Sequence, residues 1–135
     1  MTERWTIALG GHTLSDSEAF RHAVRAIIPL FGEQGGIIVH GNGPQVGELL
    51  LKNPKLPIDI AVAETQALIG YELVRQLDAV AGTRRAVAVL TRVFVDPEAA
   101  AARKPVGPSF PRHRAKALAK LHRWDMGLDP GRGYR

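Results

Sequence analysis

The sequence predicts an α/β fold, because short apolar strand candidates alternate along the chain with segments of helical periodicity. Residues 5–9 and 36–40 are the first two strand candidates, and a helical pattern from about 16 to 32 separates them. Strand, helix and strand in this order form a βαβ unit, whose right-handed crossover makes both strands parallel in one sheet. A third apolar run, residues 86–95, has the strongest β composition, and we expect a central strand there.

Length and composition restrict the class of protein. A chain of 135 residues suits a single domain. It contains no apolar run near the roughly 18 residues of a membrane span and does not begin like a signal peptide. The absence of cysteine excludes disulfides and thiolate metal sites, so we expect a cytoplasmic protein without membrane contact. The net charge of +5 raises nucleic acid as a partner. No aromatic residues alternate with the late basic ones, so we expect no such partner.

The first strand candidate, residues 5–9, reads as a short buried strand that stops at Gly10 and Gly11. Ser15 with Glu18 three residues later forms a capping box, which predicts a helix from about Asp16 toward Gly32. Apolar residues recur at helical spacing through this segment, at Phe20, Val24, Ile27, Ile28 and Phe31. Pro29 either kinks the last turn or ends the regular helix early, and the sequence is compatible with both.

The second strand candidate, residues 36–40, also reads as buried and leads into Gly41, Asn42 and Gly43. Pro44 then takes the first position of a new helix, where proline is well tolerated. Glycines let the backbone approach a ligand closely, and the unpaired amides at a helix start attract anions. Asn42 adds a side-chain donor that a plain turn does not need. An ordinary strand-to-helix turn is the alternative interpretation.

Parallel pairing of the first two strands would bring both glycine loops to one edge of the sheet. Gly10 and Gly11 would then lie at the carboxyl ends of the strands with Gly41 to Gly43, where open α/β sheets bind ligands. This arrangement predicts a site for a small anionic group. The chain has neither the dinucleotide fingerprint nor the phosphate loop of nucleotide-binding proteins, and its histidines lack metal-binding spacing. We therefore expect no metal site in this chain.

Two further helices are expected before the third strand. A short helix runs from Pro44 to about Lys52, and prolines follow it. Asp59 suits the N-cap of a longer helix that reaches about Ala81, with Gly82 as its stop. Its apolar stripe consists of Val62, Ile69, Leu73, Leu77 and Val80. The stripe packs against the sheet or forms a subunit interface, and Gly70 offers a notch for another backbone.

The last third of the chain reads as loop, basic helix and turns. Residues 104–111 form a proline-stiffened loop, and a helix from about 113 to 124 carries Leu118 and Leu121 on one side. No element is expected over residues 127–135. Lys104 is the cation of greatest interest, because a lysine ammonium is a movable point charge suited to a transferring phosphoryl group. A surface lysine is the alternative.

Several blocks of this chain resemble the N-terminal half of carbamate kinase, a branch of the amino acid kinase superfamily. The blocks occur in the family's order and nearly its spacing along the whole chain. The most specific block is His40–Gly47, which reads His-Gly-Asn-Gly-Pro-Gln-Val-Gly. The others are Ala8–Gly11, Gln66 with Ile69–Tyr71, Thr91 with Val95–Pro97, Lys104–Pro108 and Gly131–Arg135.

The resemblance implies a three-layer α/β sandwich with a mainly parallel central sheet. Residues 1–135 would be the portion that binds carbamate or carbamoyl phosphate. A following lobe, absent here, would bind ATP or ADP with Mg²⁺. The family transfers a phosphoryl group between ATP and carbamate, physiologically toward ATP, at the end of arginine fermentation. It also implies a cytoplasmic homodimer.

The resemblance further implies roles for residues of the glycine loops. Lys104 would take the part of the family's catalytic lysine. The groups that hold the carbamoyl and phosphoryl oxygens would be the backbone amides of Gly10, Gly11, Gly41 and Gly43 and the side chain of Asn42. The family has asparagine where this chain has His12, which donates from only one nitrogen when neutral. A substrate contact at His12 is therefore the least supported of these expectations.

The end of the chain at Arg135 falls inside a family motif and looks like a truncation. We expect the isolated chain to be inactive, because phosphoryl transfer needs donor and acceptor held in line and nothing here holds the nucleotide. The alternative from another class is a non-catalytic anion-binding or dimerisation module, derived from a truncated or degenerate kinase.

Overall fold

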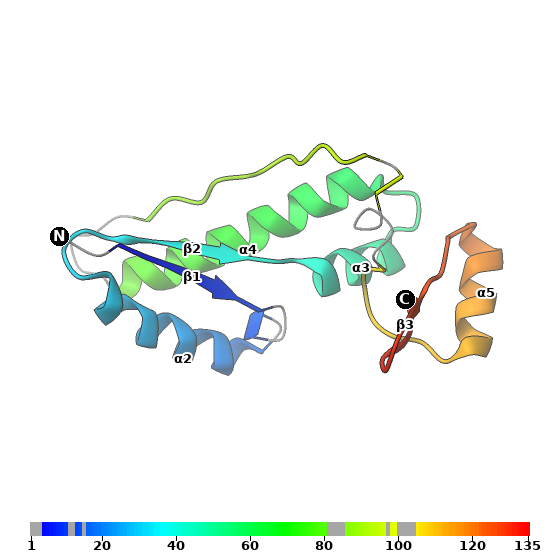
Figure 1. Cartoon of the computed structure of the whole chain (residues 1–135), viewed down its shortest axis with the longest axis horizontal. Helices are drawn as coiled ribbons and strands as arrows, with labels where there is room; N and C mark the ends of the chain where they lie inside the picture. The colour runs from blue at the N-terminus through cyan, green and yellow to red at the C-terminus, as the bar shows by residue number, and fades with distance from the viewer. Residues whose placement is uncertain (1–3, 11–12, 15, 81–85, 97, 100–104) are drawn as a thin grey trace. The chain divides into compact units, whose positions relative to one another are not determined.

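The computed structural model describes the chain except residues 1–3, 11–12, 15, 81–85, 97 and 100–104. The chain divides into two compact units, which are considered separately. Unit 1 consists of Met1–Asn42 and Val62–Leu90, and unit 2 consists of Gly43–Ala61 and Thr91–Arg135. The long helix α4, Ile58–Val80, contributes residues to both units (Figure 1).

Unit 1 contains the βαβ motif that the sequence predicts. Strands β1 (Trp5–Leu9) and β2 (Gly36–His40) pair in parallel along their whole length. Helix α2 (Ser17–Ile27) and the 3-10 helix η1 (Ile28–Phe31) connect them. The α/β class and the parallel pairing are therefore confirmed for these elements.

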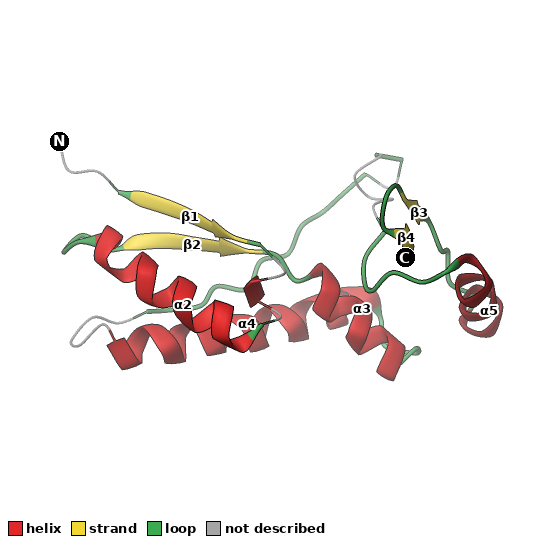
Figure 2. Ribbon diagram, turned by 90° about the horizontal axis from the view of Figure 1, so that it is seen from below, coloured by secondary structure: helices red, strands yellow, loops and turns green. Residues whose placement is uncertain are grey.

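Both helices of unit 1 pack on the same face of this two-stranded sheet, as Figure 2 shows for α2 and α4. The buried cluster consists of Leu9, Phe20, Val24, Ile27, Ile69 and Leu73, with Ile7 and Ile38 packed against it. The opposite face carries Ile37 and Val39, which are 61% and 52% exposed. The prediction that both strands are buried is therefore wrong for one face, because alternate residues of a strand point to opposite faces.

The start and end of α2 depend on two particular residues. The Asp16 carboxylate accepts hydrogen bonds from the backbone N–H groups of Glu18 (2.8 Å) and Ala19 (3.0 Å), so Asp16 is the N-cap. The predicted capping box involves Ser15, which lies outside the described residues. The regular helix ends at Ile27 and tightens into η1 around Pro29, which lacks the N–H needed to continue it.

The apolar stripe of α4 packs mainly into the core of unit 1. Ile69 and Leu73 are buried there and Leu77 packs against them, which confirms the core interpretation for these residues. A Cβ on Gly70 would lie 2.8 Å from Ala88 Cβ, so the predicted notch accommodates a later segment of the same chain.

The start of α4 differs from its prediction. The helix begins at Ile58, so Asp59 lies inside its first turn instead of capping it. The Pro57 carbonyl accepts from Ala61 N at 3.0 Å and closes that turn. Proline's fixed φ suits a position next to a helix start. The predicted stop at Gly82 lies outside the described residues.

The central strand predicted for residues 86–95 is absent from the structure. These residues form no strand, and Val87 and Val89 are exposed. The start of the segment is held instead by α4, where Asp78 Oδ1 accepts from Ala86 N at 3.4 Å. β propensity describes how a side chain fits a pleated surface and does not select the neighbouring strand, so composition alone misled here.

Unit 2 contains short elements joined by loops. Helix α3 is Gly43–Lys52 and helix α5 is Arg112–His122, both close to their predicted bounds. Strands β3 (Leu128–Asp129) and β4 (Gly133–Tyr134) form an antiparallel pair.

Two predictions for unit 2 need correction. Residues 127–135 were expected to contain no element, yet they form the β3–β4 pair. Tyr134 also exchanges backbone hydrogen bonds with Phe110, at 2.7 and 3.1 Å. Gly131, with φ of +79°, makes the intervening turn possible without strain. In α5, the buried residue is Ala115, whereas Leu121 of the predicted apolar side is exposed.

Candidate functional site

The carboxyl ends of β1 and β2 lie side by side in unit 1. Leu9 and His40 are the last pair of the parallel ladder, so the chains leave the sheet side by side at Gly10 and Gly41 (Figure 1). A Cβ built on either glycine would meet no atom within 4 Å. Neither glycine is therefore needed to relieve a contact within the described structure, and both leave the backbone accessible from the edge.

The other sequence-predicted residues of this edge are only partly described. Gly11 and His12 lie outside the described residues, as does Lys104. Gly43 begins α3 and a Cβ there also meets nothing within 4 Å. The structure thus places Gly10 and Gly41 together and follows the turn from Gly41 into a helix start.

The Asn42 side chain is directed at α4. Its amide nitrogen donates to the Val62 carbonyl at 3.0 Å and to Thr65 Oγ1 at 2.9 Å. An amide nitrogen has two N–H donors, so both are used by these contacts. The sequence predicts Asn42 as a donor to bound oxygens, whereas the structure gives it the geometry of an anchor for the turn.

Thr65 is a residue that sequence reasoning missed. Its side chain is polar but the residue is only 4% exposed, and its hydroxyl donates to Val62 O at 3.1 Å. The pattern that could have revealed it is the spacing of Val62, Thr65 and Ile69, which puts a hydroxyl on the inward side of α4. A polar residue at such a position needs a buried partner.

In unit 2, the loop that follows Lys104 is held from two sides. Gly107 lies against Gly47 of α3, so closely that a Cβ on Gly47 would overlap Gly107 Cα. On another side, Arg135 Nε donates to the Gly107 carbonyl at 2.6 Å. Arg135 Nη1 also donates to Asp129 Oδ2 at 2.7 Å, and the two side chains are only 12% and 24% exposed. In the sequence, Gly47 and Arg135 stand out only as members of blocks that resemble the family, and no structural role could be assigned to either.

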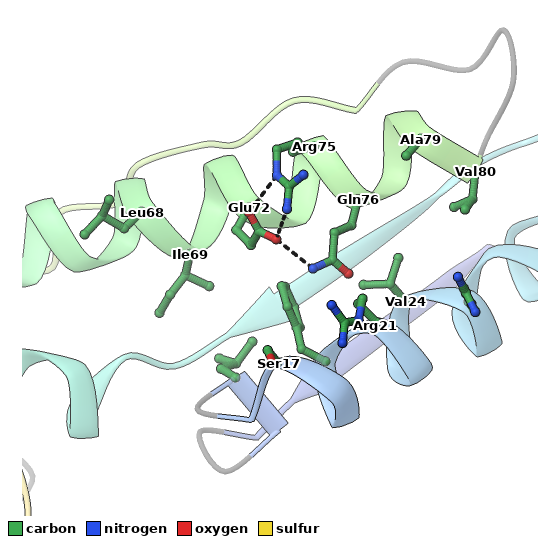
Figure 3. Close-up of a pocket in the computed structure, with 13 residues that line it drawn as sticks. Ser17, Arg21, Val24, Leu68, Ile69, Glu72, Arg75, Gln76, Ala79 and Val80 are labelled. Atoms are coloured by element: carbon green, nitrogen blue, oxygen red, sulfur yellow. Dashed lines mark hydrogen bonds and ion pairs between the residues drawn. The ribbon is translucent and has the colours of Figure 1, made fainter.

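A groove of about 650 Å³ lies between α2 and α4 in unit 1 (Figure 3). Phe20, Val24 and Ile69 form part of its apolar lining, and it contains none of the sequence-predicted site residues. Glu72 accepts from Arg75 Nε at 2.8 Å and from Gln76 at 2.7 Å along one side of this groove. The Arg75 contact, followed by Gln76, lowers the pKa of Glu72 to about 2.

Metal-binding clusters and membrane-spanning helices are both lacking among the described residues. No group of three or more His, Asp or Glu side chains is arranged to hold a metal ion within the described part of the chain. Likewise, no described helix is long and apolar enough to cross a membrane.

Comparison with known proteins relates the chain to one family of enzymes. Carbamate kinase 1 of Enterococcus faecium is 38% identical, and the match covers all of this chain and 51% of that protein. The structure of carbamate kinase from Giardia lamblia bound to citric acid matches with a TM-score of 0.79 and 29% identity, over 96% of this chain and 50% of that one. The Giardia lamblia enzyme bound to AMP-PNP matches with a TM-score of 0.65 and 29% identity, over 96% and 49%.

No family model matches the chain. The chain spans about half the length of the curated relatives it matches. Its sequence resemblance and its fold nonetheless agree, since the structural match covers nearly all of this chain. By sequence and by fold, the chain is similar to carbamate kinases and corresponds to the N-terminal half of such a protein.

Proposed function

We propose that this chain supplies the substrate-binding half of a carbamate kinase type phosphotransferase. The reaction is ATP + carbamate = ADP + carbamoyl phosphate, running physiologically toward ATP in arginine metabolism. The observation that carries the proposal is the parallel register of β1 and β2, which sets Gly10 beside Gly41 at the carboxyl edge. Open space around both glycines supports a close approach of an anionic group there.

The proposed chemistry is charge stabilisation without a covalent intermediate. Backbone amides would donate to the carbamoyl and phosphoryl oxygens, where negative charge changes during transfer. The residues assigned to this task are Gly10, Gly11, His12, Gly41 and Gly43, with Asn42 orienting the turn. Lys104 would add a positive charge to the phosphoryl group in transfer. The Giardia lamblia relative, bound to citric acid in one structure and to AMP-PNP in another, supports anionic ligands for this family.

The nucleotide would belong to the part of the relatives that this chain does not match. Residues 1–135 would then be the carbamate-binding portion of a larger three-layer sandwich. The exposed Ile37 and Val39 support this, because a third layer would cover that face of the sheet. Mg²⁺ would arrive with ATP or ADP, as the resemblance to the family implies.

We also propose that the protein is a cytoplasmic homodimer, as the resemblance implies. Leu68 and Tyr71 of α4 are exposed apolar residues of unit 1 and support a contact surface on that helix. Sedimentation velocity would measure the assembly, and Leu68→Glu is expected to dissociate it. A chain that sediments as a monomer at all concentrations would contradict this part of the proposal.

The first test measures turnover. The purified chain is mixed with carbamoyl phosphate, ADP and Mg²⁺, and ATP formation is followed. We expect none, because phosphoryl transfer needs donor and acceptor held in line, and under this proposal the nucleotide would be held by the part of the relatives that this chain does not match. Robust ATP formation would refute the proposal that this chain is only the substrate-binding half of the enzyme and is inactive by itself.

The second test measures the anion site itself. Titration with inorganic phosphate, followed by backbone amide chemical shifts, is expected to move Gly10 and Gly41. Amides of α5, which carries exposed basic residues, serve as an internal control for nonspecific attraction, which added salt removes. Shifts confined to α5 would remove the support for an anion site at the sheet edge. Phosphate binding at the edge without turnover in any reconstituted full-length enzyme would favour the non-catalytic anion-binding module instead.

A further inference from the structure

Thr65 stands out because it is the buried polar side chain among the described residues that links two elements of unit 1. It lies on α4, is 4% exposed and accepts a hydrogen bond from Asn42 Nδ2 at 2.9 Å. Asn42 immediately follows Gly41, at the end of β2. Val62 O accepts from both side chains, at 3.0 Å from Asn42 and 3.1 Å from Thr65. The contacts therefore close a triangle between the turn and the helix.

The bond from Thr65 to Val62 restrains the rotamer of the threonine. A threonine in a helix commonly donates to the carbonyl three or four residues earlier, and that bond selects its χ1 angle. With the hydroxyl proton committed to Val62, the oxygen lone pairs remain to accept from Asn42. The acceptor geometry presented to Asn42 is thus set by the helix and not by the turn.

Fixing Asn42 restricts the backbone of the turn that it belongs to. Gly41 has no Cβ, and its backbone is therefore freer in the unordered state than that of any other residue type. Ordering Gly41 consequently costs more conformational entropy. An anion held by backbone amides needs those amides already oriented, because ordering them on binding would lower the affinity. A side chain tied to a long helix at two points supplies that order before binding.

We propose that Thr65 is a positioning residue that acts through Asn42 to hold the Gly41 turn in the conformation that receives the anionic substrate group. Thr65 does not touch that group. The inference rests on the proposed function, since it takes the Gly10 and Gly41 edge as the anion site. It adds a residue of α4 to the set that determines affinity there.

The test compares Thr65→Val with Thr65→Ser, using inorganic phosphate as the probe. Valine keeps the shape and removes the hydroxyl, whereas serine keeps the hydroxyl. We expect phosphate to bind Thr65→Val about 3- to 10-fold more weakly, the range that corresponds to one hydrogen bond. Thr65→Ser should stay within about twofold of the parent chain, for the same reason. Affinity is read from the Gly10 and Gly41 amide shifts at a temperature where all variants are folded.

A double-mutant cycle with Asn42→Ala separates positioning from a general packing effect. If Thr65 acts through Asn42, Thr65→Val causes no further loss of affinity once Asn42 is alanine. A purely structural threonine would instead lower the melting temperature in both backgrounds and leave the affinity of the folded chain unchanged. Additive losses of affinity in the cycle would also overturn the proposal.

The outcomes distinguish this inference from the proposed function. If the parent chain shows no phosphate shifts at Gly10 and Gly41, the proposed anion site fails, and the inference with it. If the parent binds phosphate and Thr65→Val binds it equally well, the inference alone is wrong. Should Thr65→Val not fold, Asn42→Ala decides, because Asn42 is only half-buried. An unchanged phosphate affinity in Asn42→Ala then overturns the inference.

Discussion

Substituting Gly47 by alanine tests the contact between α3 and the loop that follows Lys104. The added Cβ would overlap Gly107 Cα, and it would lie 2.9 Å from Gly107 N and 3.0 Å from Pro108 Cδ. Both neighbours are backbone or ring atoms, so no side chain can rotate away. Relief requires the loop to move as a whole, against the hydrogen bond from Arg135 Nε to the Gly107 carbonyl.

Two opposing terms set the expected magnitude. Alanine is favoured over glycine in a helix interior by about 1 kcal/mol, which would stabilise α3. Overpacking a close contact typically costs about 1–3 kcal/mol. We expect the upper end of this range or more, because the new Cβ would collide with backbone atoms of Gly107, which cannot rotate away as a side chain can. The net prediction is a free energy of unfolding lowered by about 2 kcal/mol.

Urea unfolding followed by circular dichroism would measure this change. Gly43→Ala is the matched control, because it lies in the same helix and its Cβ would meet nothing within 4 Å. We expect a lower urea midpoint for Gly47→Ala, with an unchanged m-value, and no loss for the control. If the two variants unfold within about 0.5 kcal/mol of each other, the inferred contact between Gly47 and Gly107 is wrong.

Substitutions at three other residues have expected effects on stability. Arg135→Lys should lower the free energy of unfolding by about 1–2 kcal/mol in urea, because an ammonium cannot reproduce the fork to Gly107 and Asp129; equal stability would argue against that clamp. Glu72→Gln should cost about 0.5 kcal/mol or less at neutral pH, since the pair with Arg75 is partly exposed. Because the pKa of Glu72 falls from 4.5 to about 2, the contribution of its carboxylate is present above pH 4.5 and is lost as the pH falls toward 2, so a pH-independent difference would contradict the assignment. Asp16→Ala should lower the melting temperature while Asp16→Asn largely preserves it, because only the latter retains an acceptor for the N-cap, and equal melting temperatures would rule out the cap.

The parts of the fold that could be predicted from sequence are those fixed by neighbours in the chain. The β1–α2–β2 unit follows from the strand and helix periods of consecutive segments and from the handedness of their connection. The edge that carries Gly10 and Gly41 follows from the same local order, because parallel strands end on one side. The helix that contains Phe20 and Val24 likewise follows from local signals, the helical spacing of apolar residues and a capping-box pattern at its start.

The parts that could not be predicted depend on partners distant in sequence. The apolar run at 86–95 has strand composition, but composition does not specify which edge it pairs with, and it forms no strand. Its first residue, Ala86, is held instead by Asp78 of α4. The structural roles of Thr65 and Arg135 depend on hydrogen bonds to Asn42 and Gly107, which lie 23 and 28 positions away in the sequence. Polar residues of this kind show no periodic pattern until their partners are known.

The roles of individual glycines are visible in the structure but not in the sequence. Gly41 and Gly47 stand in one family block, and the sequence gives no reason to assign them different tasks. In the structure, a methyl group at Gly47 would collide with a neighbouring backbone, whereas one at Gly10 or Gly41 would enter open space. Gly47 therefore stabilises the fold through a contact that only glycine permits, whereas the other two make no such contact. Gly10→Ala should consequently leave the urea midpoint unchanged and weaken phosphate binding, which is the reverse of the effect expected for Gly47→Ala.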